Sequence, residues 1–213
     1  ANWEMLATNV TESNFKWTAT MPATASARVR VSDAAVPTRF DVSDVDFTIC
    51  APFSAGAAIQ VGAGPRGAAV ADFNADGIPD LAVVCQSLGS VQVMMGNGVA
   101  GVGNGTFAPP ASYNFDGESA DIVAADFNED GIADLAFTNP IENTLELLIG
   151  EGVNGHGNGV FHIDPVCPPI AEGASALLPG DFNQDGITDL AVACGTSNII
   201  AILIGIGGGG TGN

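Results

Sequence analysis

Aspartate and asparagine side chains recur at fixed spacing in three segments of this chain. The pattern is Asp-Phe-Asn-x-Asp-Gly-x-x-Asp followed by Leu-Ala, and its copies begin at Asp72, Asp126 and Asp181. Their starts are 54 and 55 residues apart. Positions 1, 3, 5 and 9 supply three carboxylates and one amide, and all of them are hard oxygen donors. So many oxygen donors on one tight turn are typical of a cation site.

The donor set predicts calcium, which takes roughly six to eight oxygen ligands. We expect about three ions, one per copy, with the backbone carbonyl at position 7 completing each set. The glycine at position 6 is expected to adopt a positive φ, because the chain must turn sharply there. The predicted ligands are Asp72, Asn74, Asp76, Ile78 and Asp80; Asp126, Asn128, Asp130, Ile132 and Asp134; and Asp181, Asn183, Asp185, Ile187 and Asp189.

The loop pattern is open to two other interpretations. An EF-hand begins in the same way but requires a bidentate Glu at position 12. Here that position holds Val83, Phe137 or Val192. Asp, Asn and Gly are also common in turns that bind no ion. All three copies keep every liganding position, and this repetition favours a cation site over a simple turn.

Short apolar segments flank each loop and must position it. In the first copy they indicate strands at 67–72, 81–85 and 90–95, then a Gly/Asn turn at 96–105 and a fourth strand near 107–115. The second copy repeats this with a strand at 145–149 and a turn at 150–159. Four short strands in each period are typical of a propeller blade. We therefore predict an all-β fold with consecutive four-stranded blades of an incomplete β-propeller, preceded by part of a β-sandwich.

Residues 1–49 differ from the repeats. Segments 14–20 and 27–31 alternate polar and apolar residues, and 42–49 resembles a closing strand. This pattern indicates half-buried antiparallel strands. We predict a partial β-sandwich at 1–49, a linker at 50–57 and three repeats at 58–213. The last repeat stops at Gly212-Asn213, which matches Gly157-Asn158, so we expect it to be truncated. We also expect the N-terminal module to be incomplete.

The charge of the chain limits the classes of partner that it can bind. Lys and Arg total 5 against 24 Asp and Glu, for a net charge of −19, and no basic residue follows Arg66. This balance excludes nucleic acid as a partner, because no basic patch is present to meet phosphates. No apolar stretch has transmembrane length. The composition favours a secreted or cell-surface protein, where calcium is abundant and would offset the repulsion between carboxylates.

Cys50, Cys85, Cys167 and Cys194 are the cysteines of the chain. Their spacing matches neither a zinc site nor a redox motif. Disulfides and buried free thiols both remain open, because pairing cannot be deduced from sequence.

The three copies read "ADFNADGIPDLAVV", "ADFNEDGIADLAFT" and "GDFNQDGITDLAVA". Through these residues the segment 58–213 resembles the FG-GAP/VCBS repeat family, whose blades also form the head of integrin α-subunits. The resemblance implies a calcium-loaded propeller, usually seven-bladed, that is exported and used in cell adhesion or ligand binding. It also implies that the remaining blades lie in sequence beyond this chain. Residues 1–49 resemble, more loosely, the C-terminal half of an immunoglobulin-like or fibronectin-like module.

Three functions remain in competition. The first is a non-catalytic calcium-binding module that presents loops to an unknown protein or glycan. The second is an accessory region of an exported hydrolase or lyase whose catalytic domain lies outside this chain. The third is a structural spacer in a surface protein. We favour the first, because the repeated pattern assigns nine carboxylates to cation sites and no Ser, Cys or His has an evident catalytic partner.

Overall fold

The computed structural model describes residues 58–164 and 168–207, together with four short strands nearer the N-terminus. The chain divides into two compact units, Ala1–Gly56 and Ala57–Asn213. In the first unit the strands pair as antiparallel couples, β1 with β4 and β2 with β3. Their bounds are β1 (Thr24–Ala27), β2 (Arg30–Ser32), β3 (Phe40–Val42) and β4 (Phe47–Ile49).

The predictions for the first unit are tested only in part. The strand expected at 14–20 lies outside the described residues. The strand expected at 27–31 corresponds to β2, which begins at Arg30, while Ala27 ends β1. The single closing strand expected at 42–49 is instead divided between the end of β3 and β4. The partial sandwich therefore stays a prediction.

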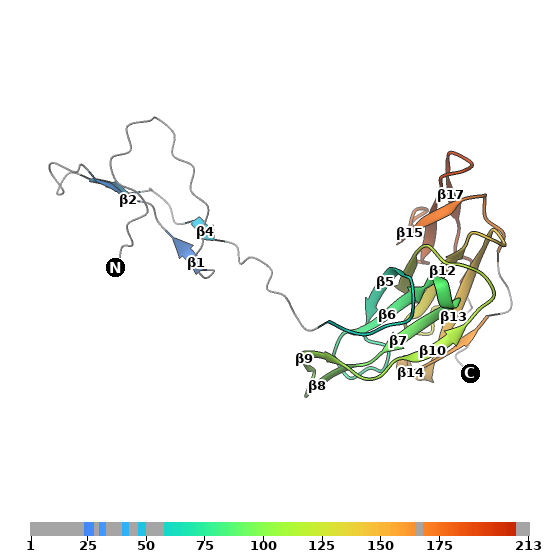
Figure 1. Ribbon diagram of the computed structural model, residues 1–213, viewed down its shortest axis with the longest axis horizontal. Helices are drawn as coiled ribbons and strands as arrows, with labels where there is room; N and C mark the ends of the chain where they lie inside the picture. The colour runs from blue at the N-terminus through green and yellow to red at the C-terminus, as the bar shows by residue number, and fades with distance from the viewer. Residues whose placement is uncertain are drawn as a thin grey trace. The chain divides into compact units, whose positions relative to one another are not determined.

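Three antiparallel blades and one separate two-stranded hairpin form the described part of the second unit, and each blade contains one copy of the repeated pattern between its first two strands (Figure 1). A short 3₁₀ helix, η1 (Gln86–Leu88), joins two strands of the first sheet. The predicted all-β architecture of consecutive blades is confirmed. Blade 1 contains β5 (Pro65–Ala71), β6 (Asp80–Cys85), β7 (Ser90–Met94) and β10 (Ala111–Asn114); blade 2 contains β11 (Ile122–Ala125), β12 (Asp134–Asn139), β13 (Thr144–Val153) and β14 (His156–Ile163); blade 3 contains β15 (Ala174–Gly180), β16 (Asp189–Cys194) and β17 (Ile199–Leu203).

The glycine-rich segments form more strand than the sequence predicted. In place of a turn over 96–105, β8 (Gly96–Val99) and β9 (Val102–Phe107) make a hairpin. In place of a turn over 150–159, β13 and β14 continue to a two-residue tip. The tips are Ala100-Gly101, with φ of 53° and 76°, and Asn154-Gly155, with φ of 54° and 75°. Two consecutive positive φ values are typical of the type I′ turn, whose twist matches that of the flanking strands.

Apolar residues fill the space between neighbouring blades. We call the face that a blade turns to the next blade its forward face, and the opposite one its rear face. Between blades 1 and 2, Val84, Val91 and Val93 of the forward face meet Leu135 and Phe137 of the rear face. Blades 2 and 3 repeat this contact, with Ala136 and Leu145 meeting Leu190 and Val192. Because side chains alternate along a strand, blade 2 contributes one face to each of these two clusters.

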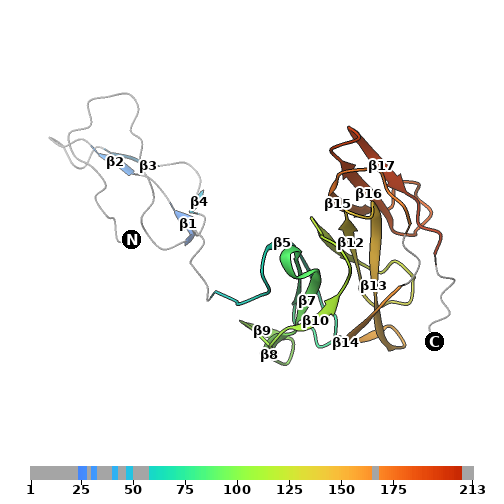
Figure 2. The same cartoon turned by 45° about the vertical axis from the view of Figure 1, so that its right-hand side comes forward.

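The first strands of the blades lie next to one another, since β11 contacts both β5 and β15 (Figure 2). The Asp121 carboxylate fixes one of these contacts, because it accepts a hydrogen bond from the Leu177 backbone N–H at 2.8 Å. Blades that stack side by side through their first strands are compatible with part of a propeller.

The rear face of blade 1 is covered by residues that precede the blade. Val83, Cys85 and Met94 form a buried cluster against which Val61 packs. The Gly62 backbone N–H donates to Gln92 Oε1 at 3.0 Å and holds this segment in place. Cys85 and Cys194 are buried free thiols, and Cys50 and Cys167 lie outside the described residues.

Candidate metal loops

Each repeated loop joins the first two strands of its blade, as the sequence predicted. The glycines at position 6 have φ of 80°, 84° and 90°, which confirms the expected left-handed turn at Gly77, Gly131 and Gly186. A second left-handed residue at position 4 was not predicted. It is Ala75, Glu129 or Gln184, with φ of 56°, 62° and 63°. None of these residue types favours a positive φ, so this conformation could not be predicted from residue type.

The side chains at positions 1, 3 and 5 hold the loop together through its own backbone. In the first loop Asp72 accepts hydrogen bonds from the N–H groups of Asp76, at 3.2 Å, and Gly77, at 2.8 Å. Asn74 Oδ1 also accepts from the Asp76 N–H at 3.1 Å, and Asp76 Oδ1 accepts from the Ile78 N–H at 2.8 Å. The other two loops repeat every one of these bonds within about 0.2 Å.

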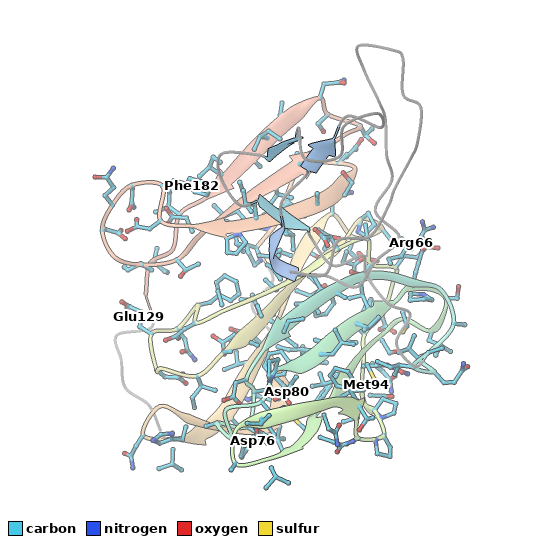
Figure 3. The ribbon with its side chains drawn as sticks, turned by 90° about the vertical axis from the view of Figure 1, so that its left-hand side faces the viewer. Arg66, Asp76, Asp80, Met94, Glu129 and Phe182 are labelled. Atoms are coloured by element: carbon cyan, nitrogen blue, oxygen red, sulfur yellow. The ribbon has the colours of Figure 1, made fainter. Side chains whose placement is uncertain are left out.

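The aspartate at position 9 is buried and ties the loop to the blade. Asp80 accepts from the N–H of Phe73 at 2.8 Å and from the N–H of Gly96 at 2.7 Å. Asp134 and Asp189 make the equivalent pairs, with Gly150 and Gly205 as the distant donors. Figure 3 labels Asp80 among the strands and Asp76 near the edge of the blade. Position 9 therefore fixes where the loop begins relative to the third strand or the backbone that directly follows it.

The donor chemistry of the loops fits a calcium ion. Each carboxylate oxygen accepts one hydrogen bond from the protein and has capacity for a second interaction. Three carboxylates, an amide oxygen and a carbonyl also match the hard ligands that calcium prefers. In the described residues, however, no three acidic, histidine or cysteine side chains converge as they would around a metal ion. In the first loop the Asn74 amide nitrogen donates to Asp76 Oδ2 at 3.0 Å, so an ion would require these two side chains to turn.

Two structural partners of the loop were not predicted from the sequence. One is the glycine 16 residues after position 9, which is Gly96, Gly150 or Gly205. A Cβ on Gly150 would lie 2.6 Å from the Ala133 carbonyl oxygen, so only glycine fits there. The other is the isoleucine side chain at position 7, because Ile78 and Ile132 are buried beneath the hairpin of their own blade. The recurring 16-residue interval was the signal for the glycine.

The first loop also contacts blade 2. The Gly159 N–H donates to the Phe73 carbonyl oxygen at 2.9 Å. The Phe73 ring meets the Phe161 ring edge-on, with centroids 5.3 Å apart. Gly157 comes so close that a Cβ there would lie 2.3 Å from the Phe73 carbonyl oxygen. The hairpin of blade 2 thus docks on the loop of blade 1.

A pair of equivalent glycines tests this docking. Gly157→Ala is expected to destabilise the chain by about 1–3 kcal/mol, because the added methyl group forces two backbones apart. The matched control is Gly103→Ala in the hairpin of blade 1, where the nearest atom to a Cβ is the Ile78 side chain at 3.2 Å. Urea unfolding of both variants measures the difference. Equal losses of stability would show that the contact with Phe73 is not specific.

Burial changes the acidity of the position 9 aspartates Asp80 and Asp134. Loss of water around the buried Asp134 raises the pKa of its carboxyl from 3.8 to about 6, and the nearby Asp130 and Asp126 add to the effect. Hydrogen bonds from Gly150 and Phe127 oppose this rise in pKa. The pKa of Asp80 is raised for the same reasons. Asp80 and Asp134 are therefore costly to ionise.

This shift predicts how a chelator-treated chain responds to pH. A folded pKa above the unfolded value means that Asp134 stabilises the fold below its unfolded pKa of 3.8 and loses that contribution as pH rises through about 6. The melting temperature of the chelator-treated chain should therefore decrease as the pH rises from 3.8 to about 6. Asp134→Asn has no proton to lose, and its profile should be flatter in this window. Profiles of equal slope would contradict the assignment to Asp134.

The fold and the loops together define a repeat protein built from antiparallel blades, each carrying an acidic loop between its first two strands. The FG-GAP-like repeat family matches residues 72–137 and 126–192, which together span more than half of the chain. The chain belongs to this family. Its members are typically extracellular and non-enzymatic. No curated protein matches the chain. In the described residues no helix is long and apolar enough to span a membrane.

Proposed function

We propose that this chain is a non-catalytic calcium-binding repeat module of an extracellular protein that serves adhesion or ligand binding. The observation that carries the proposal is the repetition of one loop geometry at three places, with three carboxylates in each copy. A loop that served only as a turn would need far fewer acidic groups, since Asn, Gly and Ser also form such turns.

Calcium would act as a structural ion in these loops. Each loop connects two paired strands. The loops of blades 1 and 2 also contact their own hairpins, because a Cβ built on Gly77 would lie 3.3 Å from the Cα of Gly101, and one built on Gly131 would lie 3.0 Å from the Cα of Gly155. An ion bound at positions 1, 3 and 5 would neutralise carboxylates that otherwise repel one another in a chain of net charge −19. Its expected role is therefore to stabilise the strand–loop–strand unit of each blade.

The hairpin tips are candidate contacts for a partner. Val99, Val102 and Val153 are exposed at the tips of the hairpins of blades 1 and 2. Exposed valines at equivalent places on neighbouring blades offer apolar contact to a protein or to the apolar face of a glycan. Substitution of these valines with serine should weaken partner binding while leaving the melting temperature unchanged.

Titration of the chelator-treated chain with calcium tests the central proposal. We expect about three ions to bind with Kd on the order of 10⁻⁴–10⁻³ M and to raise the melting temperature. Replacing Asp76, Asp130 and Asp185 with Ala should lower the calcium stoichiometry and the melting temperature together. Identical melting curves with and without calcium would refute a structural role for the ion, and circular dichroism of the same samples verifies that the chain is folded.

A further inference from the structure

The hairpin of blade 2 lies between two of the repeated loops. The segments concerned are loop 1 (72–80), loop 2 (126–134) and the bridging hairpin (150–161). Gly157 of the bridging hairpin shows the arrangement most clearly. A Cβ built there would lie 2.3 Å from the Phe73 carbonyl oxygen of loop 1 and 3.1 Å from Ile132 Cγ2 of loop 2. A single glycine of the hairpin is therefore in close contact with both loops.

On the side of loop 1, the bridging hairpin holds the backbone next to a predicted ligand. The Gly159 N–H donates to the Phe73 carbonyl oxygen at 2.9 Å, and that carbonyl belongs to the peptide unit that leads into Asn74. A Cβ on Gly159 would lie 3.6 Å from Asn74 Cβ. The Phe161 ring also packs edge-on against the Phe73 ring. The hairpin thus restricts the position of the amide side chain at position 3 of loop 1.

On the side of loop 2, the bridging hairpin is attached at its base and at its tip. At the base, the Gly150 N–H donates to Asp134 Oδ1 at 2.8 Å. At the tip, a Cβ on Gly131 would lie 3.0 Å from the Cα of Gly155. The Gly131 N–H in turn donates to Asp126 Oδ2 at 2.8 Å. The hairpin therefore contacts the backbone and the carboxylates that would surround an ion in loop 2.

We propose that the bridging hairpin couples the cation sites of loops 1 and 2, so that calcium bound in one loop raises the calcium affinity of the other. This inference rests on the proposed calcium binding and adds a form of regulation to it.

The physical origin of the coupling is the rearrangement that an ion requires. In loop 1 the Asn74 amide donates to Asp76 Oδ2 at 3.0 Å, and in loop 2 Asn128 makes the equivalent bond. Both pairs of side chains must turn to admit an ion, and in loop 1 this happens beside Gly159. An ion that fixes one loop also fixes the hairpin on it. The second loop then has less conformational freedom to lose when it binds its own ion, which is a source of positive cooperativity.

Repulsion between two divalent cations acts in the opposite direction. Loop 1 carries three carboxylates, so a bound calcium ion leaves it with one excess negative charge rather than a positive one. Salt at about 0.15 M further screens the field of one site at the other. Under these conditions we expect the contribution of the hairpin to exceed the repulsion, and the sign of the measured coupling decides between the two effects.

Calorimetric titration of defined variants measures the coupling. Asp185→Ala removes a predicted ligand of the third loop and leaves a chain with two sites. Adding Asp76→Ala or Asp130→Ala to this variant leaves loop 2 or loop 1 as the single site. The product of the two affinities in the two-site chain should exceed the product of the two isolated affinities by about fivefold or more.

Two equivalent glycines provide the matched control. Gly157→Ala in the two-site chain forces the bridging hairpin away from Phe73, so the coupling factor should fall to about one while both loops still bind calcium. Gly103→Ala introduces the same methyl group in the hairpin of blade 1, where a Cβ would meet only the Ile78 side chain of its own loop, at 3.2 Å. This variant should keep the full coupling. Loss of coupling in both variants would overturn the role of the contact with Phe73.

Hydrogen exchange gives a second readout that needs no substitution in the hairpin. In the chain with Asp130→Ala and Asp185→Ala, calcium can occupy loop 1 only. Its binding should slow amide exchange at Gly159 and at Gly131 by about threefold or more. Unchanged exchange at both amides would overturn the proposal even if Gly157→Ala failed to fold.

The titrations also separate this inference from the function on which it rests. Independent sites, or a second ion that binds more weakly than the isolated loops predict, would overturn the coupling and leave calcium binding intact. A folded chain that binds no calcium would overturn both.

Discussion

Asp134→Ala is expected to destabilise the chain by about 2–4 kcal/mol, because two buried backbone N–H groups lose their acceptor. Asp134 is fully buried and accepts from the N–H groups of Phe127 and Gly150. Desolvation of the charge, which raises the pKa of Asp134 to about 6, offsets part of what these bonds contribute. The residue nonetheless joins the start of the loop to the third strand, so its loss should affect the whole blade. Chemical denaturation at neutral pH in the presence of chelator measures this contribution without calcium.

Asp130→Ala is the matched control for this change. Asp130 lies in the same loop and carries the same charge, but it is only partly buried, and its hydrogen bonds remain within the loop. Water can replace those bonds, so we expect a loss of about 1 kcal/mol without calcium. In saturating calcium both variants should lose more, because both remove a predicted ligand. If Asp130→Ala proved as costly as Asp134→Ala in chelator, the structural role assigned to position 9 would be wrong.

Phe73→Ala is expected to cost about 3–5 kcal/mol, the range for removing a buried aromatic ring. The ring fills the interface between blades 1 and 2 and meets Phe161 edge-on, while Phe161 also contacts Tyr113. Its loss should leave a cavity that neither blade can close, since both backbones are fixed by paired strands. Equilibrium unfolding followed by fluorescence and circular dichroism gives the free energy.

Phe182→Ala supplies the comparison at the equivalent position. About half of the Phe182 ring is exposed, with a fraction of 48%, so its removal should cost under about 1 kcal/mol. The two variants change the same residue in the same motif, and only the presence of a following blade differs. Similar losses in both variants would show that the phenylalanine stabilises its own loop rather than the interface between blades.

Much of this architecture could be predicted from the sequence because the repeat specifies it locally. The alternation of short apolar segments and the glycine at position 6 indicated the three main strands and the sharp turn of each loop. The strand content of the hairpins was underestimated, because Gly-rich segments have weak strand propensity. Segments 96–105 and 150–159 therefore resemble turns in the sequence. They form strands here because each stands opposite a partner in the same hairpin, with buried isoleucine side chains beneath them.

The contacts of the loop were predicted less completely. The candidate liganding positions were predicted from their chemistry and stay a prediction, whereas the hydrogen bonds that orient the side chain at position 9 depend on backbone groups distant in sequence. Asp134 and Gly150 illustrate this, since their contact requires the whole β12–β13 pair to be formed. The left-handed conformation of Ala75, Glu129 and Gln184 is likewise imposed by bonds on either side of it rather than by residue type.

The bond from position 9 to the distant glycine also limits how the repeat can change in length. From the first loop aspartate to that glycine is 24 residues in every copy, from Asp72 to Gly96, Asp126 to Gly150 and Asp181 to Gly205. The period nevertheless changes from 54 to 55 residues, so the extra residue falls in the part that follows the glycine. Phe107 and Phe161 both lie 35 residues after the first loop aspartate, so the extra residue lies after the hairpin. Insertions for labelling or display should therefore be tolerated in the connection between a hairpin and the next blade. A single added residue between loop and glycine would shift one end of the bond and leave the buried carboxylate without its partner.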